Sequence, residues 1–123
     1  IINMQTNLIL ISALWICTAL VYLLGDVLRI FKGDFVMGEI EGKKLTQAMM
    51  MFIAAMMVIP ILMVFLNLVL PLEVNKIVNI IVAIFFFVFN LFGIPTYKGY
   101  YDKFLLLISL LFNIGVIYYS INL

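Results

Sequence analysis

Four long apolar segments run through this chain, and they limit the folds open to it more than any other feature. The sequence predicts them at about residues 7–30, 45–70, 74–92 and 101–121. A helix needs roughly 20 mainly apolar residues to cross the hydrocarbon core of a bilayer. Because the segments are continuously apolar and do not alternate every second residue, they favour helices over the strands of a membrane barrel. We therefore expect an all-α polytopic membrane protein in which residues 1–123 form a single membrane domain.

The composition supports lipid as the solvent for most of the chain. Of its 123 residues, 67% are hydrophobic and 11% are charged, whereas a soluble domain is about half apolar and a quarter charged. A cleaved signal peptide is not expected, because the first apolar segment is too long and lacks a small-residue cleavage site.

Short connections join the four segments. Residues 31–44 hold several charges and glycines and are too polar to span a membrane, and residues 94–100 form another short turn. Pro60 lies inside the second segment, where a proline removes one helix hydrogen bond and is expected to kink the helix. Loops this short make neighbouring helices antiparallel. The sequence therefore predicts an antiparallel four-helix bundle, with two long hairpins inside an oligomer as the alternative.

The positive charges are distributed unequally between the two ends of the predicted bundle. Six of the seven Lys and Arg residues lie beside the first and third loops, namely Arg29, Lys32, Lys43, Lys44, Lys98 and Lys103. Only Lys76 belongs to the end that carries both termini. Because cytoplasmic loops are enriched in Lys and Arg, we expect loops 31–44 and 94–100 in the cytoplasm and both termini outside.

The polar residues of each segment share one face of their helix, at about 100° per residue. Such side chains are costly in lipid and are expected to face the interior of the bundle. The residues that we call the polar seam are Tyr22, Asp26, Arg29, Asn67, Asn75, Lys76, Asn79, Asn90, Asp102, Lys103 and Asn113. Four further residues share these faces: Ser12, Trp15, Ser109 and Ser120. The polar seam has two interpretations, hydrogen bonds between helices or a path used by a solute, ion or ligand.

Asp26 is the acidic residue on the inward face of the first segment, near its predicted cytoplasmic end. Acids inside a membrane usually have a partner or a function. Arg29 follows three residues later, within pairing distance on a helix surface, and Lys103 is a second candidate partner. Asp26 and Asp102 are alternatively two members of one salt-bridge cluster. Asp26 is therefore expected either to fix the end of the bundle through an ion pair or to bind a proton or a cation.

The sequence lacks the side chains on which most enzymatic and metal sites depend. It has no His and one Cys, Cys17, so a His-based acid or base, a bis-His haem site and an internal disulfide are excluded. It has no basic run for nucleic acid and no glycine-rich phosphate loop after a strand. We expect a protein that is not an enzyme, holds no cofactor or metal, and binds no nucleic acid.

Several short motifs occur together along the chain. They are Leu14-Trp15, Tyr22 and Asp26-Val27-Leu28 in the first segment, Pro60-Ile61-Leu62-Met63, Leu66-Asn67 and Leu70-Pro71 in the second, and Asn75-Lys76 with Asn79-Ile80 in the third. From about Leu8 to Tyr119, this order resembles a family of small four-span bacterial membrane proteins known only as a domain of unknown function. The resemblance implies an integral protein of the bacterial cytoplasmic membrane and implies no activity.

Three functions are compatible with these observations. The short loops and the lack of reactive residues favour a structural or accessory subunit, in contact with membrane lipid and with either a partner membrane protein or copies of itself. The polar seam and the proline favour a small dimeric transporter or channel. The third function is a lipid- or quinone-binding membrane protein.

The predicted orientation is tested with reporters fused to the C-terminus. One reporter fluoresces only in the cytoplasm, and the other is enzymatically active only outside the membrane. Because the positive charges place both termini outside, we expect the second reporter to be active and the first to be dark. Fluorescence from the cytoplasmic reporter would contradict this orientation.

Overall fold

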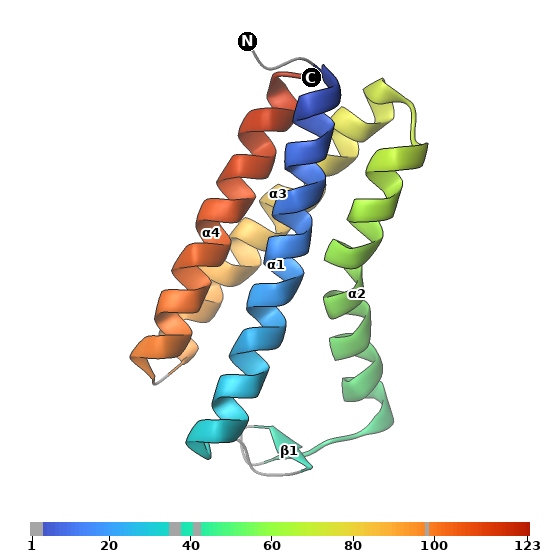
Figure 1. Ribbon diagram of the computed structural model, residues 1–123. Helices are drawn as coiled ribbons and strands as arrows, with labels where there is room; N and C mark the ends of the chain where they lie inside the picture. The colour runs from blue at the N-terminus through green and yellow to red at the C-terminus, as the bar shows by residue number, and fades with distance from the viewer. Residues whose placement is uncertain (1–3, 35–37, 41–42, 98) are drawn as a thin grey trace.

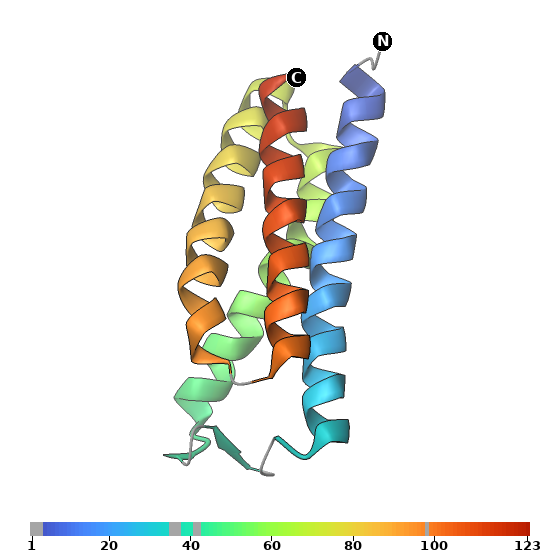
Figure 2. The same ribbon diagram turned by 90° about the vertical axis from the view of Figure 1, so that its left-hand side faces the viewer.

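The protein is a bundle of four long helices. The computed structural model describes residues 4–34, 38–40, 43–97 and 99–123. The helices are α1 (Met4–Lys32), α2 (Gln47–Val69), α3 (Leu72–Gly93) and α4 (Tyr100–Ile121). All four are long and apolar enough to cross a membrane, and successive helices run in opposite directions (Figure 1 and Figure 2). The prediction of an all-α membrane bundle is confirmed.

Two small elements lie in the loops and were not predicted. In the first loop, β1 (Glu39–Ile40) pairs antiparallel with β2 (Lys43–Lys44), with Glu39 opposite Lys44. After α3, the chain continues directly into the 3₁₀ turn η1 (Ile94–Thr96). Both chain ends lie at the end of the bundle opposite the β1–β2 hairpin (Figure 1). Lys98, which contributed to the predicted orientation, lies outside the described residues.

Local sequence explains where α1 ends. Gly33 has a φ of +80°, a left-handed conformation that glycine adopts without a steric penalty. The N–H of Gly33 donates to the carbonyl of Ile30 at 3.1 Å, and the N–H of Asp34 donates to the carbonyl of Arg29 at 3.1 Å. This pair of bonds is the Schellman pattern, which satisfies carbonyl groups that a helix end leaves free. Asp34 therefore begins the loop from a fixed position just beyond the helix.

The ends of α2 are also set by individual residues. The hydroxyl of Thr46 accepts a hydrogen bond from the N–H of Met49 at 3.2 Å and caps the first turn. At the other end only Leu70 and Pro71 separate α2 from α3, so the connection between these helices is a two-residue turn. Pro60 is buried inside α2, which continues through it. Because proline has no N–H, one backbone hydrogen bond of the helix is missing there.

The helices are not all packed against one another equally. α1 packs closely along both α2 and α4, and α3 packs closely along α4. α2 and α3 share far fewer close contacts, although they are consecutive in the chain, and Figure 1 shows them diverging from the turn that joins them. The order around the bundle is therefore α2, α1, α4, α3, with α2 held mainly by α1.

The apolar core lies between all four helices, with two buried residues each from α1 and α3 and one each from α2 and α4. Its buried members are Ile11, Trp15, Met63, Ala83, Phe86 and Val116. The ring of Phe86 lies 6.2 Å from that of Trp15 and 6.1 Å from that of Tyr22, measured between centroids. Phe86 of α3 thus contacts two aromatic residues of α1. These aromatic contacts hold the facing surfaces of α1 and α3 together. They therefore position the polar side chains that come before and after them on the same helix faces.

A glycine allows α1 and α4 to approach closely. A Cβ atom on Gly115 would lie 3.0 Å from Cδ1 of Leu14, which is tighter than ordinary van der Waals contact. Small residues at helix contacts are typical of membrane bundles, where close packing replaces the hydrophobic effect between helices. The outer surface of all four helices is correspondingly apolar, with large exposed side chains that include Phe31, Leu68 and Phe92.

Candidate functional site

The structure places the polar seam largely inside the bundle. Its buried members are Asn67, Asn75, Asn79, Asn90, Asp102 and Asn113. The partly buried members are Tyr22, Asp26, Arg29, Lys76 and Lys103. Two buried polar residues, Asn7 and Thr18, were not identified from the sequence. Thr18 lies three residues after Trp15 and four before Tyr22, so the helical period contained the signal for it.

Asn79 is the centre of a hydrogen-bonded group that joins three helices. Its side-chain amide donates to the side-chain oxygen of Asn67 at 2.6 Å, and its own oxygen accepts from the indole N–H of Trp15 at 2.8 Å. The same amide nitrogen also donates to the backbone carbonyl of Asn75 at 2.7 Å. Both the donor and the acceptor of this fully buried side chain are therefore satisfied. We call Trp15, Asn67, Asn75 and Asn79 the asparagine cluster.

Asn75 ties the asparagine cluster to the turn between α2 and α3. Its amide nitrogen donates to the backbone carbonyls of Asn67 and Leu70, both at 3.2 Å. The last carbonyls of a helix have no partner within the helix and need one from elsewhere. Asn75 supplies that partner for the end of α2, so a residue of α3 completes the helix before it.

A second bond between α1 and α3 lies further along the same faces. The amide nitrogen of Asn90 donates to the hydroxyl of Tyr22 at 2.7 Å. Phe86 packs against Tyr22 and against Trp15, and so lies between this bond and the asparagine cluster. α1 and α3 are therefore joined by two hydrogen bonds with an aromatic contact between them.

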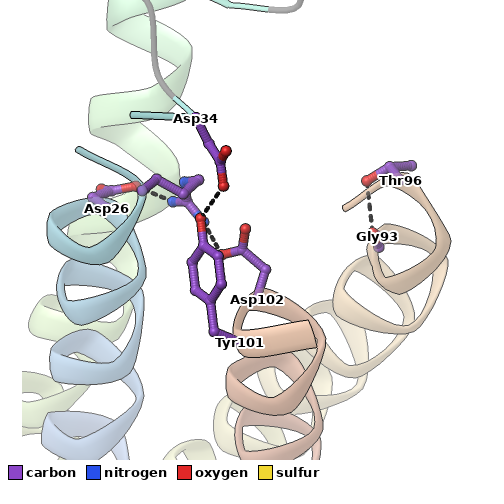
Figure 3. Close-up of polar contacts among 7 residues, drawn as sticks. Asp26, Asp34, Gly93, Thr96, Tyr101 and Asp102 are labelled. Carbon is purple, nitrogen blue, oxygen red and sulfur yellow. Dashed lines mark hydrogen bonds and ion pairs between the residues drawn. The ribbon is translucent and has the colours of Figure 1, made fainter. Parts of the chain in front are cut away.

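An ion-pair cluster lies at the end of the bundle opposite the chain termini. The guanidinium of Arg29 pairs with Asp26 on its own helix and donates to Asp102 of α4 at 2.7 Å (Figure 3). The same guanidinium lies 5.3 Å from the ring centroid of Tyr97, within the range of a cation–π contact. We call Asp26, Arg29, Tyr97 and Asp102 the Arg29 cluster.

The two carboxylates of the Arg29 cluster lie in different surroundings. The side chain of Asp102 is 6% exposed, whereas that of Asp26 is 42% exposed. The expected pairing of Asp26 with Arg29 is present, as is the alternative in which Asp26 and Asp102 belong to one cluster. Within the described part of the chain, Asp26 does not pair with Lys103. Arg29 is therefore the group that compensates a buried negative charge and joins α1 to α4.

A contact beside the Arg29 cluster fixes the start of the first loop. The hydroxyl of Tyr101 donates to a carboxylate oxygen of Asp34 at 2.5 Å (Figure 3). Through this bond the residues after α1 are attached to the first turn of α4. On the neighbouring turn, the hydroxyl of Thr96 donates to the carbonyl of Gly93 at 2.6 Å and completes the end of α3.

Some buried polar side chains have no hydrogen-bond partner among the described residues. Asn113 is fully buried near the middle of α4, and neither its amide nitrogen nor its oxygen has a partner among the described residues. The hydroxyl of Ser109, one turn earlier, is likewise buried and unpartnered there. Asn113 is thus the opposite case to Asn79, which has the same burial and a full set of hydrogen bonds.

The described residues contain no group of three or more Cys, Asp or Glu side chains arranged to hold a metal ion. Cys17 is a free, partly buried thiol. Within this part of the chain, the contacts of the polar seam are hydrogen bonds and ion pairs, both within single helices and between helices.

Substitutions in the Arg29 cluster test which carboxylate depends on Arg29. Arg29→Met leaves Asp102 as a buried charge without a cation, and we expect a loss of about 3–5 kcal/mol in the free energy of unfolding. Asp26→Asn removes a pair whose carboxylate is 42% exposed and is expected to cost less than about 1 kcal/mol. The measurement is unfolding of the purified protein in mixed micelles, followed by circular dichroism.

The control is the double variant Arg29→Met/Asp102→Leu, which removes the buried charge together with its partner. We expect it to recover most of the stability that Arg29→Met loses, because a matched apolar pair avoids the cost of an unpaired charge. Equal losses for Arg29→Met and Asp26→Asn would show that Asp102 does not depend on Arg29.

Comparison with known proteins gives one result that covers nearly the whole chain. Residues 3–123 match the family of unknown function DUF6326. The comparisons with curated proteins and with solved structures gave no match. The resemblance to a domain of unknown function is confirmed, and the chain belongs to the DUF6326 family.

Proposed function

We propose that this chain is a non-enzymatic accessory or structural protein of the membrane, which acts by binding other membrane proteins or copies of itself. The observation that carries the proposal is the state of Asn79. Its side chain is fully buried and bonded to Trp15 and Asn67 on two other helices. Polar groups that bond one another in this way hold helices together and are not available to a passing solute.

The outer face of α2 is the surface that suits a partner helix. α2 is held mainly by α1, and its remaining surface carries exposed side chains that include Met51, Phe65 and Leu68. Six of the eight methionines of the chain lie in α2, and two of these, Met50 and Met51, are exposed. Methionine is unbranched and polarizable, and it is common on binding surfaces that adapt to a partner.

We further propose that the protein lies in the bacterial inner membrane, with loops 31–44 and 94–100 in the cytoplasm and both termini outside. The distribution of Lys and Arg supports this orientation. Both chain ends lie at one end of the bundle (Figure 1), as an even number of spans requires. The Arg29 cluster then lies on the cytoplasmic side.

The test places a photo-crosslinking phenylalanine analogue at Phe65 of α2 in native membranes. The matched control places it at Leu111 of α4, which is exposed to nearly the same extent on another face. We expect a crosslinked product of one defined mass from position 65 and only lipid adducts from position 111. Mass spectrometry of the product then distinguishes a second copy from a partner protein.

Two outcomes would contradict the proposal. The first is a monomer with only lipid adducts at both positions. The second is solute flux through vesicles that contain the purified protein, lost in the variant Asn113→Leu. That second result would favour the alternative of a small dimeric transporter or channel, since Asn113 is a buried polar side chain outside the asparagine and Arg29 clusters, with neither amide atom bonded among the described residues.

A further inference from the structure

A polar pocket lies at the end of the bundle that carries both chain termini. It is lined by Asn7 of α1 and by Tyr118, Tyr119 and Asn122 at the end of α4. These residues are close to the ends of two membrane-spanning helices, where lipid headgroups begin and where tyrosine is common. The pocket is remote from the Arg29 cluster, which closes the opposite end of the bundle.

Hydrogen bonds to backbone carbonyls set the orientation of the two asparagine amides of the pocket. The amide nitrogen of Asn7 donates to the backbone carbonyl of Asn122 at 3.3 Å, and that of Asn122 donates to the carbonyl of Tyr118 at 2.8 Å. A backbone carbonyl only accepts hydrogen bonds, so these two bonds fix which end of each amide is the nitrogen. Both amide oxygens, which are acceptors, are left without a bond in this arrangement of the described residues, and each amide nitrogen keeps a second N–H.

The oxygen of Asn7 has particular need of a donor. Asn7 is 3% exposed, and this oxygen has no partner among the described residues. A buried acceptor without a partner costs free energy that a suitable donor recovers. Asn7 lines the pocket, so a donor bound there lies beside the side chain that carries this oxygen.

The tyrosines add a preference for positive charge. Tyr118 and Tyr119 pack edge to face, with ring centroids 5.2 Å apart and an angle of 77° between the rings. The faces of aromatic rings attract cations. The described residues that line the pocket include no Lys or Arg, so no side-chain cation among them competes with a bound positive charge.

We propose that this pocket binds a primary ammonium group. An ammonium with N–H bonds satisfies the Asn7 oxygen and contacts the tyrosine rings, whereas a trimethylammonium group has no N–H to donate. The ethanolamine headgroup of a membrane lipid and a free small amine both carry this chemistry. The proposal adds a ligand site to the accessory role and does not depend on the orientation of the bundle.

The test measures lipid retention by the full chain. The protein is released for native mass spectrometry from nanodiscs that contain equal amounts of phosphatidylethanolamine and phosphatidylcholine. We expect phosphatidylethanolamine to be retained preferentially. In Tyr118→Leu we expect that preference to fall about fivefold, since a cation–π contact is worth roughly 1 kcal/mol.

The matched control is Tyr100→Leu, at the other end of the bundle. Tyr118 is 61% exposed and Tyr100 is 88% exposed, so neither substitution removes a core contact and both variants are expected to fold. A second variant, Asn7→Leu, removes the buried acceptor and is expected to abolish the preference. Its thermal unfolding is measured alongside, and Tyr118→Leu tests the site independently if Asn7→Leu does not fold.

Adding free ethanolamine identifies the source of the ammonium group. Displacement of the lipid at millimolar ethanolamine indicates a site for small amines, and retention of the lipid indicates a site for the headgroup. Either result supports ammonium binding when the Tyr118 dependence is present. Equal retention of the two lipids, or equal effects of Tyr118→Leu and Tyr100→Leu, would overturn the proposal.

Discussion

The arrangement of this bundle depends on the hydrogen bonds of the Asn79 side chain. In lipid there is no hydrophobic effect to drive helices together, so packing and directed hydrogen bonds determine which faces meet. Asn79 accepts from Trp15 of α1 and donates to Asn67 of α2. Once these two bonds are made, the rotation of α3 is fixed, and the residues seven and eleven positions later, Phe86 and Asn90, necessarily face α1.

The pairing of α1 with α4 is fixed separately, at its two ends. At one end Arg29 joins Asp102, and at the other the amide of Asn7 donates to the carbonyl of Asn122. Between them Gly115 allows the two helices to lie close together. The polar contacts at the two ends therefore fix the register of α1 against α4, and the glycine between them sets the distance between the two helices.

These attachments leave α2 as the least constrained helix. It packs along α1 and has few close contacts with α3, and its buried residues, Pro60, Met63 and Asn67, all lie in its second half. A helix attached mainly at one end and along one neighbour keeps a large apolar face for lipid or a partner. This arrangement is the structural basis of the accessory role that we propose.

Much of this fold was predictable from the sequence because helical periodicity determines which residues share a face. The inward positions of Asn79, Asn90 and Asp102 follow from that period alone. The choice of partners does not, since it depends on how four helices close on one another. Periodicity could not distinguish Arg29 from Lys103 as the partner of Asp26, nor show that Asn7 meets Asn122 across 115 positions of sequence.

Two other features lay outside the reach of the sequence pattern for physical reasons. The β1–β2 hairpin has two residues in each strand, too few to show an alternating pattern. The separation of α2 from α3 is a property of the bundle as a whole, because two helices joined by a short turn usually pack side by side.

The most direct test of this account compares two asparagines that are equally buried and differently bonded. Asn79 and Asn113 are both fully buried, but only Asn79 has partners among the described residues. The measurement is the free energy of unfolding of Asn79→Leu and of Asn113→Leu, followed through the fluorescence of Trp15, the one tryptophan of the chain. The account predicts that Asn79→Leu lowers the free energy of unfolding by about 2–4 kcal/mol, because the indole N–H of Trp15 and the side-chain oxygen of Asn67 lose their partner. It predicts no loss for Asn113→Leu. Equal stability of the two variants would contradict it.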